Sequence, residues 1–227
     1  MFIDLRLKLW LPSAVAHFAV QLLLLYRRIH YGYPFRRIPL TQGKFAIVDP
    51  EDYAWLSQYK WQARKDGPSY YAARTFNING KKFNRQMHRE IILRHSPDAC
   101  SLLNSDLVVD HINNNGLDNR KVNLRIVTQR QNCWNSRAKF ISRSSRYKGV
   151  SWHSKMRKWV SKISIDGKSV HLGYFDNEIA AAKAYDAAAK KHRGQYAYLN
   201  FPQRSQPYAV RFTQCTRGPV RPPQFFF

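Results

Sequence analysis

Residues 109 to 132 read VDHINNNGLDNRKVNLRIVTQRQN, and this stretch decides the fold of the first half of the chain. The apolar residues 107 to 109 predict a strand that delivers Asp110 and His111 into an asparagine-rich loop. A second strand is expected over residues 123 to 127, followed by a helix that begins at Thr128. The stretch therefore predicts two strands and one helix, with polar side chains where the first strand ends.

Polar residues on the first strand and on the helix can share one site. Neighbouring residues of a strand point to opposite sides, so Asp110 can bind a metal ion while His111 faces a water molecule. Carboxylate and amide oxygens, here from Asp110 and Asn132, suit a hard cation such as Mg²⁺ or Mn²⁺. A base for water and a cation for the phosphate are what phosphodiester hydrolysis needs.

The same 24 residues resemble the HNH endonuclease motif, in the form found in phage and intron homing endonucleases. That form begins with Asp-His and ends with Asn where other members have His. The resemblance implies that Asp110 and Asn132 bind the metal, that His111 is the general base and that Asn123 orients His111. It also implies a ββα-metal fold for this module, which we place at residues 38 to 134.

Each of these polar residues also has an ordinary structural interpretation. Asparagine-rich segments commonly form turns through bonds between side chains and backbone, and we assign Asn113, Asn114, Asn115 and Asn119 to that role. Asn123 alone could cap a strand, and Asn132 alone could be a polar helix residue. His88, in the segment MHREI, competes for a catalytic role, but such a histidine is more often a packing residue where a helix starts.

Upstream of the motif, the pattern predicts short strands and helices preceded by an apolar segment. Strands are expected at 44–48, 61–64, 70–75 and 81–87, and helices at 50–59 and 88–93. Residues 9 to 26 are mostly apolar and resemble a short membrane anchor or a signal sequence, but Pro12, His17 and Gln21 interrupt them. We therefore interpret residues 1 to 37 as an apolar leader or an extension.

Residues 147 to 202 predict a three-stranded antiparallel sheet covered by one helix, which makes the whole chain α+β. The Asp166-Gly167 turn sets the register of the last two strands, and alternation then separates an apolar face from a polar, basic face. A helix from Glu178 to His192 is expected to cover the apolar face. The residues expected on that face are Val150, Trp152, Trp159, Ile163, Ile165, Val170 and Leu172, against Ala180, Ala181, Ala184, Tyr185 and Ala188 of the helix.

This second module resembles the APETALA-two/ethylene-response-factor (AP2/ERF) DNA-binding domain. It matches the Y-x-G-V start, the K-W of the second strand, the L-G-x-F segment and the A-x-A-Y-D helix of that family. The resemblance implies DNA recognition by the three strands, at Lys148, Ser151, His153, Lys162, Ser164 and His171. Several of these positions hold arginine or tryptophan in the plant proteins, so the plant target sequence should not be transferred.

The charge of the chain selects a class of partner. The 38 Lys and Arg against 14 Asp and Glu leave a formal charge of +24 that is spread along the sequence, as expected for a protein that binds a polyanion. Only three cysteines occur, and no C-x-x-C pair suggests a zinc finger, so a reducing compartment is expected. The resemblance to phage and intron endonucleases implies the cytoplasm of a bacterial or phage-infected cell, in association with the nucleoid. Residues 135 to 146 predict a linker, and residues 203 to 227 predict a disordered tail.

These observations favour a homing-type endonuclease that cuts double-stranded DNA and is targeted by its second module, without a small-molecule cofactor. Two rivals remain open. One is a DNA-binding regulator that does not cut, which predicts a footprint without strand breaks. The other is a membrane-associated basic protein, which rests on residues 9 to 26 and predicts pelleting with membranes. The sequence leaves the target site and the oligomeric state undetermined.

Overall fold

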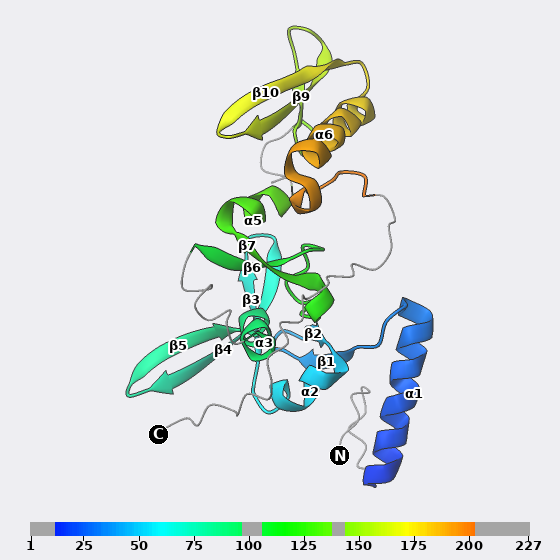
Figure 1. Cartoon of the computed structure of the whole chain (residues 1–227), viewed down its shortest axis with the longest axis vertical. Coiled ribbons are helices and arrows are strands. Elements are labelled where there is room, and N and C mark those ends of the chain that lie inside the picture. Colours follow the sequence, from blue (N-terminus) through cyan, green and yellow to red (C-terminus); the bar gives the residue numbers. More distant parts are fainter. Residues whose placement is uncertain (1–11, 97–105, 138–143, 203–227) are drawn as a thin grey trace.

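The computed structural model describes residues 12–96, 106–137 and 144–202, and it extends along one long axis (Figure 1). The sheet of β8, β9 and β10 lies at one end with α6, and β6, β7 and α5 lie in the middle. The remaining strands and α2 and α3 lie toward the other end. The β4–β5 hairpin projects to one side there, and α1 runs along the opposite side.

The first core is built by short elements that bury alternate residues. Ile38 of β1, Val48 of β2 and Ile91 of α3 are among its fully buried side chains. The strands and helices expected between residues 44 and 95 are present with boundaries shifted by a few residues. They are β2 (Phe45–Val48), α2 (Pro50–Leu56), β3 (Gln62–Asp66), β4 (Ser69–Ile78), β5 (Lys81–Gln86) and α3 (Met87–His95). β1 (Arg36–Pro39) was not expected; it pairs antiparallel with β2.

The strand pair expected around the motif is formed by β6 (Leu107–His111) and β7 (Leu124–Thr128), which run antiparallel. α5 (Gln129–Asn135) follows at once, because Thr128 and Gln131 form a reciprocal capping box that satisfies the first backbone N–H groups of the helix. The second strand was expected to open at Asn123, but Asn123 ends the 3₁₀ helix η1 (Lys121–Asn123). The amide of Asn123 therefore faces the loop instead of the sheet.

β2 joins the first core to the loop between β6 and β7. The Ile47 N–H donates to the Leu117 carbonyl at 2.8 Å, and the Asn119 N–H donates to the Ile47 carbonyl at 2.8 Å. These bonds fix the backbone on both sides of Asp118, so the loop beside the strand end has a defined conformation.

The second core confirms the three-stranded antiparallel sheet packed on one helix. β8 (Val150–His153), β9 (Lys158–Ile165) and β10 (Lys168–Phe175) pair in the order β10-β9-β8, and α6 (Glu178–Arg193) covers them before the short η2 (Gly194–Tyr196). Gly149 permits this packing, because it has a φ of +79° and an added Cβ would lie 2.0 Å from the Tyr185 ring.

Three expectations for this core were wrong in detail. Ala180 is exposed, and Ala182 and Ala189 are buried together with Ala181 and Tyr185. The buried row follows i, i+4 spacing from residue 181, so the helix is rotated relative to the expected stripe. Trp152 and Val170 are 43% and 39% exposed, and Trp152 packs edge-on against Trp159 instead.

Residues 12 to 37, which were expected to be a leader, contain α1 (Ser13–Tyr31) and the start of β1. Arg27 donates to the Phe35 carbonyl at 2.6 Å, and the Arg120 guanidinium lies over the Tyr33 ring at 3.5 Å. None of the helices in the described part of the chain combines the length and hydrophobicity needed to cross a bilayer. The expected tail and residues 138–143 of the expected linker lie outside the described residues.

Candidate active site

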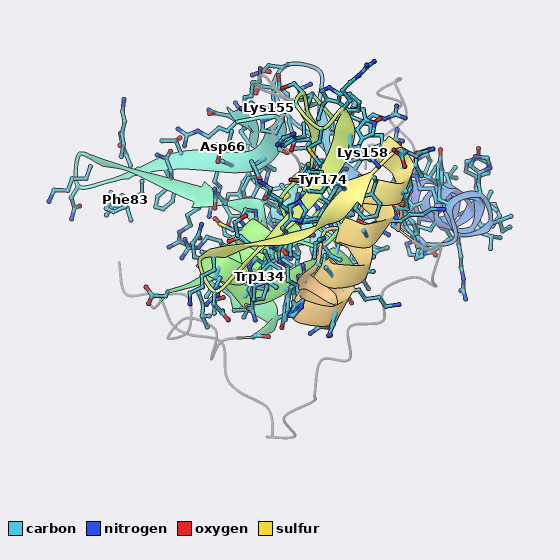
Figure 2. The ribbon with its side chains drawn as sticks, turned by 90° about the horizontal axis from the view of Figure 1, so that it is seen from above. Asp66, Phe83, Trp134, Lys155, Lys158 and Tyr174 are labelled. Carbon is cyan, nitrogen blue, oxygen red and sulfur yellow. The ribbon has the colours of Figure 1, made fainter. Side chains whose placement is uncertain are left out.

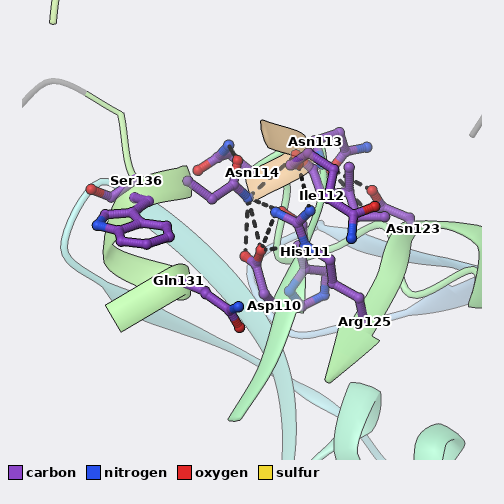
Figure 3. Close-up of polar contacts among 12 residues, drawn as sticks. Asp110, His111, Ile112, Asn113, Asn114, Asn123, Arg125, Gln131 and Ser136 are labelled. Atoms are coloured by element: carbon purple, nitrogen blue, oxygen red, sulfur yellow. Dashed lines mark hydrogen bonds and ion pairs between the residues drawn. The ribbon is translucent and has the colours of Figure 1, made fainter. Parts of the chain in front are cut away.

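Asp110 is buried at the end of β6 between two side chains that donate hydrogen bonds to it (Figure 3). Its Oδ2 accepts hydrogen bonds from Nε and Nη2 of Arg125 at 2.9 and 2.8 Å, because Asp110 and Arg125 face each other across β6 and β7. The Asn135 amide donates to both carboxylate oxygens, at 3.1 and 3.0 Å. Among the described residues, Oδ1 thus accepts a single hydrogen bond, which leaves it a lone pair for a cation.

His111, the next residue, is 5% exposed and has a different set of partners. Its Nε2 lies 3.3 Å from Oδ1 of Asn119, so an N–H at Nε2 can donate to this oxygen while Nδ1 keeps its lone pair. Burial lowers the pKa of His111, and the Asn119 hydrogen bond and the Asp110 charge oppose this shift. The ring is therefore neutral near pH 7 and can accept a proton.

His88 and Tyr71 form the aromatic wall of the His111 pocket. The His88 ring meets the His111 ring at right angles with 4.9 Å between centroids, and the Tyr71 ring lies 5.7 Å from His111. Burial, together with the nearby His111 and Arg89, holds the pKa of His88 well below its usual value. Nδ1 of His88 is buried without a hydrogen-bond partner among the described residues. His88 is thus a packing residue on α3 that directly contacts the candidate base.

These two buried histidines predict that stability falls in mild acid. Because both folded-state pKa values are lowered, the unfolded chain takes up protons near the usual pKa of 6.5 while the folded chain does not. The free energy of unfolding should be highest above that pH and should fall below it, by up to about 1.4 kcal/mol per pH unit for each histidine. Urea unfolding between about pH 7.5 and pH 5 measures this slope. His88→Leu should remove one histidine's share of this slope, and an unchanged slope in His88→Leu contradicts the assignment.

Asn123 does not take the place expected for it. Its Oδ1 accepts from the Asn113 N–H at 3.0 Å, and its Nδ2 donates to Asn113 Oδ1 and to the Asp118 carbonyl at 3.0 and 2.7 Å. Asn123 therefore closes the loop, and Asn119, which was assigned to turn formation, contacts His111. No local pattern distinguishes Asn119 from its neighbours, because the bond between its backbone and Ile47 places it.

The turn assignment describes Asn113 and Asn115 well, since their side chains accept from backbone N–H groups two residues ahead. Asn114 instead donates to the Asn135 carboxamide oxygen at 3.2 Å. Asn135 was assigned to the linker, yet it ends α5, is 4% exposed and also donates to the His111 carbonyl. Asn132 lies three residues earlier and is half-buried. Spacing of three places both amides on one helix face, which is the signal that could have identified Asn135.

The residues expected to contact DNA divide into two groups. Ser151, Lys162, Ser164 and His171 are exposed on one face of the β8–β10 sheet, and His153 is half-buried. Lys148 lies elsewhere: its Nζ donates to the carbonyls of Trp134 and Ser136 at 2.8 and 2.6 Å. These are among the last carbonyls of α5 and its cap, so Lys148 holds the end of that helix.

Tyr174 lies on the same sheet face and was not among the residues expected to contact DNA. A register shift between His171 and Gly173 brings Tyr174 beside both His171 and His153, with ring centroids 4.6 and 5.6 Å apart. Tyr174 is 44% exposed and is labelled in Figure 2, which looks onto this end of the molecule. Tyr174 is the variable residue of the L-G-x-F segment, and this position is the sequence feature that could have identified it.

A basic groove of about 880 Å³ lies on β3, β4, β5 and α3. Arg64 faces Tyr71 and Gln86 faces Ala73 in the strand register, so these side chains share one sheet face. The groove is lined by Arg64, Lys65, Asp66, Tyr71, Ala73, Asn84, Arg85, Gln86, Arg89, Glu90 and Leu93. Of its two acids, Glu90 is neutralised by Arg74, which leaves a net positive surface. Tyr71 lines the groove and also packs against the His111 ring, so a single side chain separates the groove from the candidate base.

Three carboxylates form a separate group, Asp49, Glu51 and Asp52, whose oxygens lie within 4.8 Å of one another. Asp49 accepts from the Lys121 N–H, and Glu51 pairs with the Lys121 ammonium. Asp52 pairs with His95. Each carboxylate thus has a protein donor, and we assign the group to the packing of α2.

Comparison with known proteins identifies both parts of the chain. The AP2 domain model matches residues 145–195. The APETALA2-like protein 2 of Oryza sativa subsp. indica is 52% identical over 60 residues, which are 26% of this chain and 14% of that protein. The AP2-like ethylene-responsive transcription factor TOE2 of Arabidopsis thaliana is 50% identical over 60 residues, or 26% and 12% of the two chains. The chain therefore spans about one seventh of the length of these plant relatives.

A viral protein matches a much longer part of the chain. An uncharacterized HNH endonuclease of Acanthamoeba polyphaga mimivirus is 30% identical over 159 residues, which are 70% of this chain and 76% of the viral protein.

Proposed function

Since the chain belongs to the HNH endonuclease family and carries an AP2 domain, we propose that it is a metal-dependent endonuclease that hydrolyses phosphodiester bonds in double-stranded DNA. One observation carries the proposal: Asp110 and His111 are adjacent, buried at one strand end and held by different partners. A carboxylate free to bind a cation at one oxygen and a neutral imidazole are the two groups that metal-assisted hydrolysis uses.

His111 acts as the general base. It takes a proton from water at Nδ1, because Nε2–H is held by Asn119 Oδ1, and the water oxygen attacks phosphorus as the 3′ oxygen leaves. Asn119 is a positioning residue, since it holds the tautomer and the ring orientation. General-base catalysis of this kind accelerates a reaction by roughly 100- to 10,000-fold.

The donor set of the site fits a hard divalent cation. Asp110 Oδ1 keeps a lone pair, and Asn132, whose amide oxygen would be the second ligand, lies three residues before Asn135 on the same helix. We assign the cation to these two residues, with Mg²⁺ the preferred ion and Mn²⁺ a substitute. When bound, the ion neutralises charge on the phosphate and on the leaving oxygen.

Two surfaces hold the duplex in this proposal. The exposed face of β8–β10, with Lys162, His171 and Tyr174, enters the major groove as a small twisted sheet. The basic groove on β3–β5 binds the phosphates of the strand that leads to His111. Arginine and amide side chains there are suited to phosphate oxygens and base edges.

Removing one arginine from the groove should weaken DNA binding in a salt-dependent manner. Arg64→Ala is expected to lower the slope of log Kd against log salt by about one unit, the share of one phosphate contact. Titrations with a chelator present, so that no strand is cut, measure this slope. Arg37→Ala is the matched control, because Arg37 is exposed on β1 in another sheet. Equal slopes for the two variants would show that the groove does not contact the DNA phosphates.

Purified protein on supercoiled plasmid tests the cleavage itself. Magnesium should produce nicked or linear plasmid with free 3′-hydroxyl ends, and a chelator should stop the reaction. A footprint on the DNA without any strand break under these conditions would instead favour a DNA-binding regulator.

A further inference from the structure

Arg125 contacts both parts of the molecule with one guanidinium group. Nε and Nη2 donate to Asp110, and Nη1 donates to the Gln195 carbonyl at 2.8 Å, although Gln195 lies 70 residues further along the chain. The guanidinium carbon also lies 4.9 Å from the centre of the Tyr196 ring. Gln195 and Tyr196 belong to η2, directly after the helix of the AP2 domain. A single side chain therefore connects the proposed metal ligand to the DNA-binding module.

A second set of contacts surrounds Trp134 near the end of α5, labelled in Figure 2. The Trp134 carbonyl accepts from Lys148 Nζ at 2.8 Å and from the Tyr198 N–H at 3.3 Å. The Arg193 guanidinium lies 5.7 Å from the Trp134 ring and is itself anchored on the Tyr185 hydroxyl. Residues from both ends of the AP2 domain thus hold one helix of the nuclease module.

A third contact, between Arg130 and Asp166, differs from these two because it is exposed to solvent. These side chains are 56% and 80% exposed, so water screens their attraction and the pair contributes little. Arg125 and Asp110 are only 12% and 6% exposed, and removing one partner of such a pair leaves the other charge buried without compensation. Among these three contacts, the Arg125 and Trp134 clusters are the ones that can fix orientation.

We propose that Arg125 is a positioning residue that holds the AP2 domain in one orientation relative to the Asp110 carboxylate, so that the sequence bound by the AP2 domain determines which phosphodiester bond is cut. This specificity role rests on the proposed function. The alternative is a connection through the chain alone: a random coil of about 12 residues spans roughly 20 Å on average. At about 3.4 Å per base pair, such a tether would spread the cuts over about six base pairs.

The Arg-to-Lys change tests this role. The Arg125→Lys variant keeps a cation for Asp110, but the point charge of an ammonium group cannot also reach the Gln195 carbonyl as the planar guanidinium does. Arg130→Lys is the matched control at the exposed pair. Lys148→Met breaks the Trp134 cluster from the AP2 side, far along the chain from Asp110.

Two measurements separate this proposal from the proposed cleavage. A DNA site is first selected from a random library with the His111→Ala protein, and cut positions are mapped on it. The parent and Arg130→Lys should cut at one position per strand, while Arg125→Lys and Lys148→Met should spread their cuts over about six base pairs. Distances between spin labels at positions 60 and 155, in a background with the three native cysteines replaced by serine, need no cleavage. They should be narrowly distributed in the parent and broad in the two interface variants.

A narrow distance distribution in both Arg125→Lys and Lys148→Met overturns the proposal, whether or not the protein cuts DNA. Cuts that stay at one position in both variants overturn it equally. If the parent makes no cut but the distances broaden as expected, the cleavage hypothesis fails and the positioning by Arg125 stands.

Discussion

Replacing His111 by alanine should lower the cleavage rate by roughly 100- to 10,000-fold while leaving DNA affinity unchanged. The imidazole is a neutral base at the end of β6, and its lone pair at Nδ1 depends on the bond from Nε2 to Asn119. DNA affinity should persist because the expected DNA surfaces, on β8–β10 and in the β3–β5 groove, do not include His111. Single-turnover cleavage and gel-shift titration measure the two quantities separately.

Three controls separate the loss of the base from a general loss of activity or folding. His192→Ala changes an exposed histidine on α6 and should cleave at the parent rate. Added imidazole should restore part of the activity of His111→Ala, because it supplies the missing base to the space that the side chain leaves. Circular dichroism checks that the variant is folded. Nicking of plasmid by the folded variant at the parent rate would show that His111 is not the base.

Asp110→Asn is expected to weaken metal binding at this site and to lower cleavage by roughly 100- to 1,000-fold, as the loss of several kcal/mol of charge stabilisation would. The amide has nearly the same shape as the carboxylate but carries no charge, and a neutral oxygen binds a hard cation more weakly. Mn²⁺ binding, followed by electron paramagnetic resonance, should weaken by roughly tenfold or more. This readout does not depend on activity.

The substitution also leaves Arg125 without its counter-charge, so stability must be measured in parallel. A loss of about 3 kcal/mol or more is expected, because the guanidinium is almost fully buried. Asp166→Asn is the matched control, since it removes an exposed carboxylate that pairs with Arg130. Parent-level Mn²⁺ affinity in folded Asp110→Asn would exclude Asp110 as a metal ligand.

Much of the fold follows from local patterns. The strands around residues 107 and 124 and the capped helix from Thr128 are specified by apolar runs and by a side-chain cap, all within a few residues. The turn at Asp166-Gly167 sets the register of β9 and β10 in the same way. Errors arose where packing rotates an element as a whole, as for Ala180 and Ala182 of α6.

Only part of the candidate site could be predicted from the sequence. Asp110 and His111 are neighbours in the sequence. Because successive side chains of a strand point to opposite sides, the two residues contact different partners. The partners themselves are distant or locally indistinct: Asn119 is placed by its backbone bond to Ile47, and Asn135 lies in a segment whose composition resembles a linker. Asn123 resembles a catalytic residue by its spacing, but its hydrogen bonds close the loop.

The sequence by itself therefore determined the two modules, the pairing of a carboxylate with an imidazole at one strand end, and the basic sheet face, because each depends on neighbours along the chain. The tertiary structure alone decided which side chains bind that pair. It also decided that Lys148 binds the end of α5 and that Arg125 contacts both modules. A contact between residues 70 positions apart forms only when folded helices and strands pack against each other. The shape and charge of the packed surfaces determine which side chains meet, and local sequence patterns do not show this.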